Sequence, residues 1–223
     1  MGISAQYIGR SVTMIKGHSL GTALAAALAL AAPARAQEFD YYVLALSWSP
    51  SWCSSQAARG DAPEQCAPDR DLGFSLHGLW PQYADGGWPE NCRTDARDPA
   101  RGVTAAMADI MGSAGLAWYQ WKKHGRCAGL SAPDYFDLSR RAYGAISLPA
   151  FPPGRRSATE VEQALLDANP DFRPDDMIVT CADGQVREAR ICLTPELEPR
   201  ACGPDVIRDA CRSAEPLDMP PIP

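Results

Sequence analysis

The chain has 223 residues, with 21 Lys and Arg against 27 Asp and Glu, and its formal net charge is −6 at pH 7. Such a length fits one domain of ordinary size. The excess of acid excludes a protein that holds nucleic acid by bulk charge, so a polyanionic substrate would need a local group of cations.

Residues 1–36 have the pattern of a secretory signal peptide. Arg10 and Lys16 precede an apolar run, Leu20–Ala32, and the segment ends in the small residues of Ala34–Ala36. The run of about 13 residues is shorter than the roughly 20 that a membrane helix needs, which disfavours the alternative of an anchor helix. Its removal would take three basic residues and no acid, so the net charge would become −9. We expect an exported protein, periplasmic or extracellular, with no membrane partner in its mature form.

All eight cysteines follow this segment. An even number of cysteines behind an export signal predicts disulfides formed in an oxidising compartment. A zinc site is the alternative, but no C-x-x-C pair is present and only two histidines follow residue 36, so no metal is expected. Cys53 and Cys66 flank one polar loop and are expected to pair, whereas the residues alone leave the other pairings open.

The first half of the chain contains two predicted strands. Phe39–Trp48 is rich in β-branched and aromatic residues and predicts a buried strand that ends at Pro50. A loop is expected over Ser51–Arg70. Gly73–Trp80 alternates between apolar and polar residues, which predicts a half-buried strand with His77 pointing away from the apolar side.

Polar, turn-rich sequence fills residues 81–101, and a loop rich in Pro and Gly covers Leu148–Arg156. Ser157 and Glu160 have the spacing of a capping box, which predicts the start of a helix. Helices are expected over Thr104–Gly112, Leu116–His124, Ser131–Gly144 and Ser157–Ala168.

Two alternating runs within Asp176–Leu193 surround Asp183–Gly184 and predict a β-hairpin. The proline-rich residues after Cys211 are not expected to pack. We therefore expect one domain over residues 37–213 and a tail over 214–223. Strands and helices interleave without a regular βαβ rhythm, which predicts an α+β class with a central antiparallel or mixed sheet flanked by helices.

Two histidines remain after residue 36, His77 and His124, and Lys123 adds a fixed charge beside the second. Histidine titrates near neutral pH, so one imidazole can accept a proton while another donates one. Cleavage of RNA needs a base for the 2′-OH, an acid for the leaving 5′-oxygen and a cation for the phosphoryl oxygens. The nucleophile is already part of the substrate, so the reaction needs no metal or cofactor, and DNA cannot react in this way.

The segments FSLHGLWPQ (Phe74–Gln82) and WKKHGRC (Trp121–Cys127) resemble the two active-site signatures of the ribonuclease T2 family. The first signature, HGLWP, is present without change at His77–Pro81. The second, H-E-W-x-K-H-G-x-C, is matched from Trp121 onward. YVLALSW near the start and the VTC and ICL segments near the end also resemble the family, so the likeness covers nearly all of the chain after residue 36.

The resemblance implies a disulfide-stapled T2-type fold and an endoribonuclease that cleaves single-stranded RNA with low base specificity. The products would be a 2′,3′-cyclic phosphate and then 3′-phosphate ends. His124 would be the general base, His77 the general acid and Lys123 the group that stabilises the transition state, while Trp80 would position phosphate or base. We expect a monomer. The disulfides implied are Cys92–Cys127 and Cys192–Cys202 nested inside Cys181–Cys211, beside the expected Cys53–Cys66.

The second signature departs from the family at its front, where Tyr119–Gln120 replaces the usual His-Glu. Gln120 lies four residues before His124, so on a helix the two share a face. Gln120 could bind a phosphoryl oxygen or orient its neighbours, and Tyr119 offers a phenol to the substrate. Loss of a carboxylate beside His124 should lower the pKa of that histidine relative to other members. The alternative reading is a catalytically weakened exported protein that binds RNA.

Overall fold

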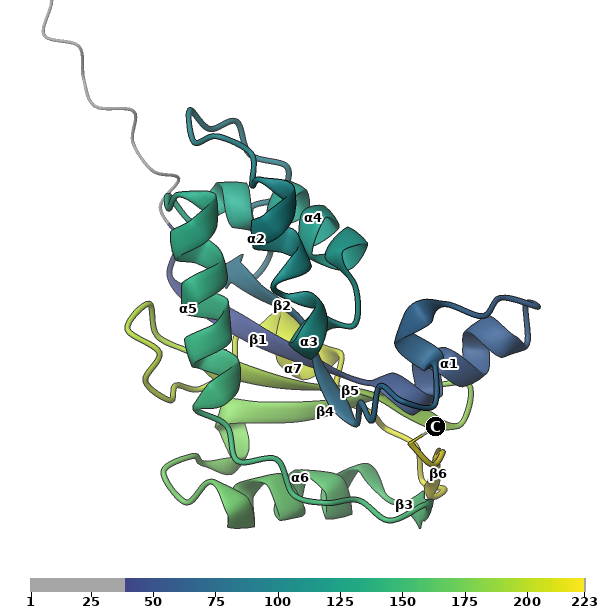
Figure 1. Ribbon diagram of the computed structural model, residues 1–223. Helices are drawn as coiled ribbons and strands as arrows, with labels where there is room; N and C mark the ends of the chain where they lie inside the picture. Colours follow the sequence, from purple (N-terminus) through teal and green to yellow (C-terminus); the bar gives the residue numbers. More distant parts are fainter. Residues whose placement is uncertain (1–38, 223) are drawn as a thin grey trace, which may run out of the picture. The chain divides into compact units, whose positions relative to one another are not determined.

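The computed structural model describes residues 39–222, so the expected signal peptide of residues 1–36 lies outside the described residues. A six-stranded sheet forms the centre (Figure 1), in the order β2-β1-β5-β6-β3, with β4 paired to β5. The strands are β1 (Tyr41–Trp48), β2 (Phe74–Gln82), β3 (Gly154–Arg156), β4 (Met177–Ala182), β5 (Gln185–Leu193) and β6 (Leu217–Met219). The β5–β6 pair is parallel and the other pairs are antiparallel, which confirms the predicted α+β class with a mixed sheet.

Helices lie on both faces of this sheet. The α-helices are α1 (Ser49–Ala57), α2 (Arg101–Ala105), α3 (Ala108–Met111), α4 (Ala114–Lys123), α5 (Ala132–Gly144), α6 (Ala158–Ala168) and α7 (Pro204–Arg208). Short 3-10 helices are η1 (Glu64–Cys66), η2 (Gly125–Cys127) and η3 (Pro174–Asp176). Within residues 39–222 no helix combines the length and apolar character that a membrane span requires.

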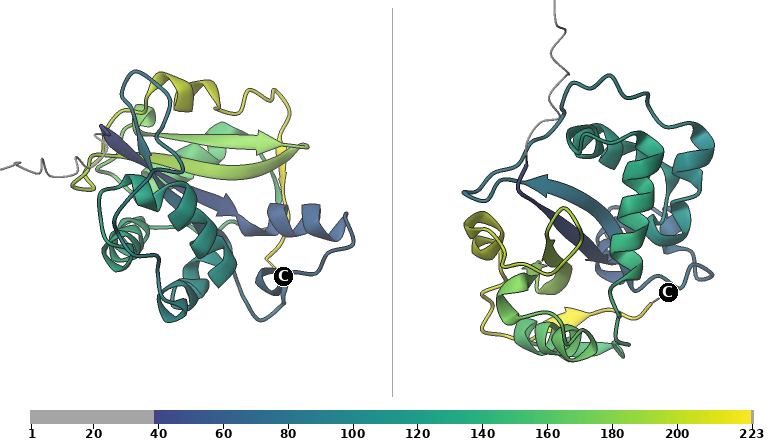
Figure 2. Two further views of the ribbon diagram at one scale, coloured as in Figure 1. Left: turned by 90° about the horizontal axis from the view of Figure 1, so that it is seen from above. Right: turned by 90° about the vertical axis from the view of Figure 1, so that its left-hand side faces the viewer.

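Strand β1 is the central element because both of its faces are apolar. Tyr42, Leu44 and Leu46 face the larger core, which the helices α2 to α6 cover, and Tyr41 and Val43 face a smaller core beside α7. Figure 2 shows α7 on the side of the sheet opposite the teal helices. A strand buried on both faces excludes water from the middle of the sheet and gives the site a rigid base.

Helix α5 is fixed to β2 by two phenols. The Tyr135 hydroxyl donates to the Leu79 carbonyl at 2.8 Å, and the Tyr143 hydroxyl donates to the Phe74 carbonyl at 2.9 Å. Both hydrogen bonds satisfy polar groups at the edge of the larger core, which matters because buried unpaired groups are costly. They hold the strand that carries His77 in a fixed position against the helical layer.

Several helix boundaries differ from the sequence-based expectation. Ser51–Arg70 is not a plain loop, because α1 continues directly from β1 with Pro50 in its first turn, where a missing N–H is harmless. The helix expected over Thr104–Gly112 is split into α2 and α3, and Gly112, with φ 85°, ends the second part. Helix α7, which also begins with a proline, was not predicted.

The expected unpacked tail is the clearest correction. Leu217 and Met219 are buried in the larger core, and β6 pairs with β3 at the edge of the sheet. The reason is local alternation: in Leu-Asp-Met the two apolar side chains point to one face and the acid points to the other. Residues 214–223 therefore include a strand, and packed structure continues beyond residue 213.

Four disulfides join the cysteines, and no cysteine is free. They are Cys53–Cys66, Cys92–Cys127, Cys181–Cys211 and Cys192–Cys202. These are the pairs that the sequence analysis expected. With every thiol oxidised, no thiolate remains for the zinc site that was considered as an alternative.

Candidate active site

His77 is the extra residue of a β-bulge in β2. Ala45 of β1 pairs with Gly78 and the next residue, Leu46, pairs with Leu76, so His77 has no partner in the register. A bulge shifts the alternation of side chains by one residue. Leu76 and Leu79 therefore both face the larger core, although strict alternation would place them on opposite faces. The strand is also mostly buried on both faces, not half-buried as its pattern predicted.

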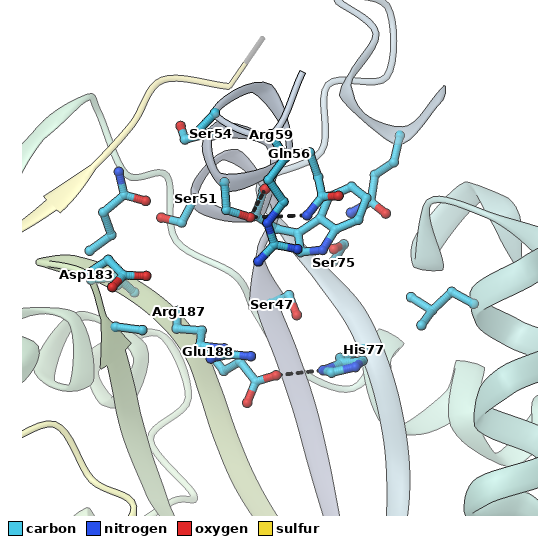
Figure 3. Close-up of a pocket in the computed structure, with 18 of the residues that line it drawn as sticks. Ser47, Ser51, Ser54, Gln56, Arg59, Ser75, His77, Asp183, Arg187 and Glu188 are labelled. Carbon is cyan, nitrogen blue, oxygen red and sulfur yellow. Dashed lines mark hydrogen bonds and ion pairs between the residues drawn. The ribbon is translucent and has the colours of Figure 1, made fainter. Parts of the chain in front are cut away.

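A carboxylate from β5 meets the His77 ring. The distance from His77 Nδ1 to Glu188 Oε1 is 2.6 Å (Figure 3), and Glu188 is only 3% exposed. A second bulge aims this side chain, because Thr180 of β4 pairs with Glu188 and Cys181 pairs with Val186, which leaves Arg187 between them without a partner. The two bulges together bring residues from non-adjacent strands onto one polar region of the sheet.

Glu188 is held in its charged form. Burial opposes ionisation, but the hydrogen bond and charge of His77 and the neighbouring Arg190 outweigh it and lower the Glu188 pKa from 4.5 to about 2. Arg190 donates from Nε to Glu188 Oε2 at 3.0 Å and from Nη1 to Asp209 Oδ2 at 2.8 Å. Because an ionised carboxylate can only accept, the Nδ1 proton of His77 must be present in this contact.

His124 lies where α4 ends. Its N–H donates to the Gln120 carbonyl at 2.8 Å, and η2 follows immediately. Gly125 allows this close join, since a Cβ there would lie 2.5 Å from Cε3 of Trp121 and 2.9 Å from Tyr135. The Cys92–Cys127 disulfide then ties η2 to the loop after β2. The position of His124 thus depends on a helix end, a glycine and a disulfide.

The indole of Trp80 contacts both imidazoles. Its ring centroid is 5.1 Å from that of His77, in an edge-on arrangement, and 5.2 Å from that of His124, in a stacked arrangement. Trp80 Nε1 donates to Gln120 Oε1 at 2.8 Å, and Gln120 is 1% exposed. A side chain at Gly78 would overlap both of these groups, so the glycine is required here.

The electrostatic setting of His124 is the reverse of that of His77. His124 is 4% exposed, and no hydrogen-bond partner within residues 39–222 reaches its buried Nδ1. Burial, followed by the charges of Lys123 and His77, lowers its pKa from 6.5 to about 3. His124 is therefore neutral over the whole physiological range of pH.

Lys123 and Tyr119 lie one turn apart on the same helix. The Lys123 ammonium is 3.6 Å from Glu90 Oε2, which also accepts a hydrogen bond from Nε1 of the exposed Trp88 at 3.2 Å. Tyr119 is 52% exposed and four residues before Lys123, so the phenol and the ammonium share a face of α4. This face brings the half-buried ammonium of Lys123 to the site.

The structure thus gathers His77, Trp80, Gln120 and His124 into one cluster, with Lys123 and Tyr119 at its rim. Two roles were expected for Gln120: binding a phosphoryl oxygen or orienting its neighbours. Because Gln120 is buried and bonded to Trp80, its position favours the second role, orienting the indole. Glu188, Arg190 and Glu90 were not predicted from the sequence. A signal existed for the first two, because opposite charges at alternate positions of a strand, here Glu188 and Arg190, lie on one face and can pair.

A groove of about 780 Å³ begins at His77 and Glu188. It continues between α1 and the β4–β5 turn, and Figure 3 shows Arg59 on one side and Arg187 on the other. Both arginines are exposed, and exposed Trp52 lines the same wall. Among residues 39–222 no group of three or more His, Cys, Asp and Glu side chains has an arrangement that could hold a metal ion.

Comparison with known structures identifies the fold. The RNase-related protein from Calystegia sepium superposes with a TM-score of 0.65 at 21% identity, covering 82% of this chain and 98% of that one. Trichomaglin, described as a novel S-like ribonuclease, superposes with a TM-score of 0.65 at 23% identity, covering 83% and 100%. The architecture is therefore that of the T2-type ribonuclease fold.

Sequence comparison leads to the same class. Residues 39–148, which contain both histidine motifs, match the Ribonuclease T2 family. A ribonuclease of Aeromonas hydrophila is 45% identical over 111 residues, and a probable ribonuclease of Haemophilus influenzae is 38% identical over 120 residues. The matches cover 50% and 49% of this chain but only 48% and 44% of those proteins, so the chain spans about half their length. The chain belongs to the ribonuclease T2 family.

Proposed function

We propose that the chain is a metal-independent endoribonuclease that cleaves single-stranded RNA by transesterification. The observation that carries this proposal is the pair of histidines that both contact the Trp80 ring, one bonded to a buried carboxylate and the other buried without one. Two titratable groups in such opposed environments are suited to opposite proton-transfer roles. The products are a 2′,3′-cyclic phosphate and then a 3′-phosphate end.

His124 is the general base. A general base must be neutral at the working pH. Burial lowers the His124 pKa to about 3, which keeps the ring neutral near neutral pH. In the substrate complex the negatively charged phosphate lies near His124. It stabilises the protonated ring that forms when His124 accepts the 2′-OH proton. Stacking on Trp80 fixes the ring plane before substrate arrives. The 2′-oxygen then attacks the adjacent phosphorus.

His77 is the general acid. Its Nδ1–H is committed to Glu188, so Nε2, on the other edge of the ring, is the nitrogen that donates to the leaving 5′-oxygen. The second step reverses the roles: His77 takes a proton from water, and the hydroxide opens the cyclic phosphate while His124 returns a proton to the 2′-oxygen.

Lys123 stabilises the negative charge that builds on the phosphoryl oxygens. Its partner Glu90 is exposed at the rim, so the ammonium can exchange this carboxylate for a phosphate. The exposed Tyr119 hydroxyl on the same helix face is a further phosphate donor. No metal takes part, since the nucleophile belongs to the substrate and three side chains supply acid, base and charge.

The substrate class is supported by the relatives and by the groove. The relatives from Aeromonas and Haemophilus are named ribonucleases, and the structure of RNase NT holds 5′-AMP. In this chain the groove that leaves His77 carries Arg59 and Arg187, which suit a phosphate backbone. Its serine and glutamine lining offers hydrogen bonds without fixing one base, in keeping with low base specificity.

We further propose that the protein acts outside the cytoplasm as a monomer. Four disulfides need an oxidising compartment, and they suit the export segment that the sequence predicts over residues 1–36. The catalytic domain then begins near residue 37. It includes the β6 strand, so it extends beyond residue 213.

The decisive experiment incubates the oxidised protein, from residue 37 onward, with a single-stranded RNA in excess EDTA. Cleavage with a detectable 2′,3′-cyclic intermediate is expected, with no cleavage of DNA of the same sequence. His77→Ala and His124→Ala should each reduce the rate at least about 100-fold. Binding of RNA without turnover would instead support the weakened RNA-binding protein, and loss of cleavage in EDTA would exclude the metal-free mechanism.

A further inference from the structure

We propose that Glu188 is a positioning residue for His77, held in place by Arg190. The inference rests on the proposed function, because it assigns how the general acid is oriented and charged. Both residues lie on β5, beyond the segment of residues 39–148 that matches the family. The pair therefore adds to the two histidine signatures a third element, contributed by a different strand.

The contact itself determines which nitrogen of His77 reacts. Glu188 Oε1 is 2.6 Å from Nδ1, and the carboxylate is buried and ionised. An ionised carboxylate accepts and cannot donate, so it fixes the proton on Nδ1 and leaves Nε2 for proton exchange with substrate. A buried carboxylate on the far nitrogen of a catalytic histidine has this effect in serine proteases, where it sets the tautomer and stabilises the imidazolium.

Arg190 prevents the carboxylate from turning away. Its Nε donates to Glu188 Oε2 at 3.0 Å, so each carboxylate oxygen has its own partner. Its Nη1 is bound to Asp209 at 2.8 Å, and its guanidinium lies 5.5 Å from the Trp80 ring centroid. The guanidinium is thus held by two carboxylates, and its planar, fixed geometry allows it to orient them with little loss of entropy.

The Glu188–Arg190 pair also explains why the two histidines have different electrostatic surroundings although they are close together. Within residues 39–222, Glu188 is the carboxylate that contacts either ring, and it contacts His77 alone. The position beside His124, where the family usually has a glutamate, is occupied by uncharged Gln120. The negative charge therefore lies beside the proposed acid and not beside the proposed base.

A leaving-group comparison tests the role of Glu188. Glu188→Gln should lower kcat for a dinucleotide at least about tenfold, since protonation of the alkoxide leaving group is impaired. The same variant should lose less than about threefold on a nucleoside 3′-(4-nitrophenyl) phosphate, whose leaving group departs without a proton. Glu188→Asp, which keeps the charge, should recover part of the dinucleotide activity. Equal losses on both substrates would overturn the proposal.

A double-mutant cycle gives a second readout. If Glu188 acts through His77, then adding Glu188→Gln to His77→Ala should not reduce the residual rate further. Additive losses would show that Glu188 has a separate effect and would overturn the proposal. Glu162→Gln is the matched control, because the Glu162 carboxylate is partly buried and bound to Val179 N–H at 2.8 Å, away from the site.

The experiments distinguish failure of the proposed function from failure of the positioning role of Glu188. If the unsubstituted protein does not cleave RNA, the proposed function is wrong whatever the variants do. If it cleaves RNA through a cyclic intermediate but Glu188→Gln behaves like Glu162→Gln on both substrates, the function stands and the positioning role of Glu188 is wrong. Thermal unfolding of each variant, measured beside its rate, shows that a loss of rate is not a loss of folded protein.

Discussion

Trp80 stacks on His124 with ring centroids 5.2 Å apart and planes 26° apart, and the edge of the same indole is bonded to Gln120 on the helix that carries His124. The indole is therefore fixed to α4 at two points although it belongs to β2. This arrangement makes Gln120 the residue through which the departure from the family signature acts. Its effect should appear in the pH dependence of the reaction.

Gln120→Glu should move the acid limb of the kcat/KM profile to higher pH by about one unit or more. The carboxylate can keep the hydrogen bond from Trp80, but its negative charge favours the protonated form of His124 and raises a pKa that now lies at about 3. Because kcat/KM reports the free enzyme, its profile against pH is the appropriate measurement. Gln120→Leu, which loses the bond without adding charge, should lower the rate and leave the acid limb in place. An unchanged profile in Gln120→Glu would show that this position does not tune His124.

Stability should fall as the pH is lowered from about 6.5 toward 3. The unfolded His124 binds a proton below 6.5, whereas the folded one remains neutral to about 3, so the unfolded state takes up more protons across this window. Glu188, whose pKa falls from 4.5 to about 2, adds a further loss of stability as the pH falls through that lower range. Denaturant unfolding at a series of pH values measures both effects. His124→Asn should flatten the upper part of the curve, and an equal slope in that variant would contradict the assignment.

Glu90→Gln should strengthen the binding of RNA at low ionic strength. Glu90 lies 3.6 Å from the Lys123 ammonium and competes with a phosphate for it. Both side chains are partly open to solvent, so KM should fall only by about two- to threefold, and the effect should vanish in concentrated salt. Glu196→Gln, with the same change of charge on an exposed loop, is the control for general electrostatics. A similar gain in the control would remove the specific role of Glu90.

Gly125→Ala should destabilise the protein by about 1–3 kcal/mol, the usual cost of overpacking. The added methyl group would lie 2.5 Å from Trp121 and 2.9 Å from Tyr135, both in the larger core. His124 precedes this glycine, so activity should fall together with stability. Gly144→Ala, at the end of α5 with open space around it, should be neutral or slightly stabilising by comparison. Denaturant unfolding of the two variants gives the difference directly.

Local signals in the sequence were sufficient for several elements. The capping box of Ser157 and Glu160 forms as predicted, because both hydrogen bonds join residues three apart. The hairpin turn at Asp183–Gly184 also forms, with positive φ at both residues, as a two-residue turn of type I′ requires. These features depend on neighbours in the chain and need no tertiary contact.

Other elements could not be predicted because distant residues decide them. Leu217–Met219 is too short to be predicted as a strand from its sequence. It forms one because it pairs with the edge strand β3 and because Leu217 and Met219 pack into the larger core. His77 followed an alternating pattern in the sequence, but its direction depends on a bulge that appears only when β2 is set against β1. The fold class could be predicted, whereas register and edges could not.

The sequence by itself determined the two histidine motifs, the lysine beside His124 and the family they resemble, because these are contiguous patterns of residue types. Only the tertiary structure decided that Glu188 meets His77, across 111 residues of chain. It also decided that Gln120 is bonded to Trp80 and buried. The physical reason is that side-chain direction in a sheet depends on register, and two bulges on different strands set that register here.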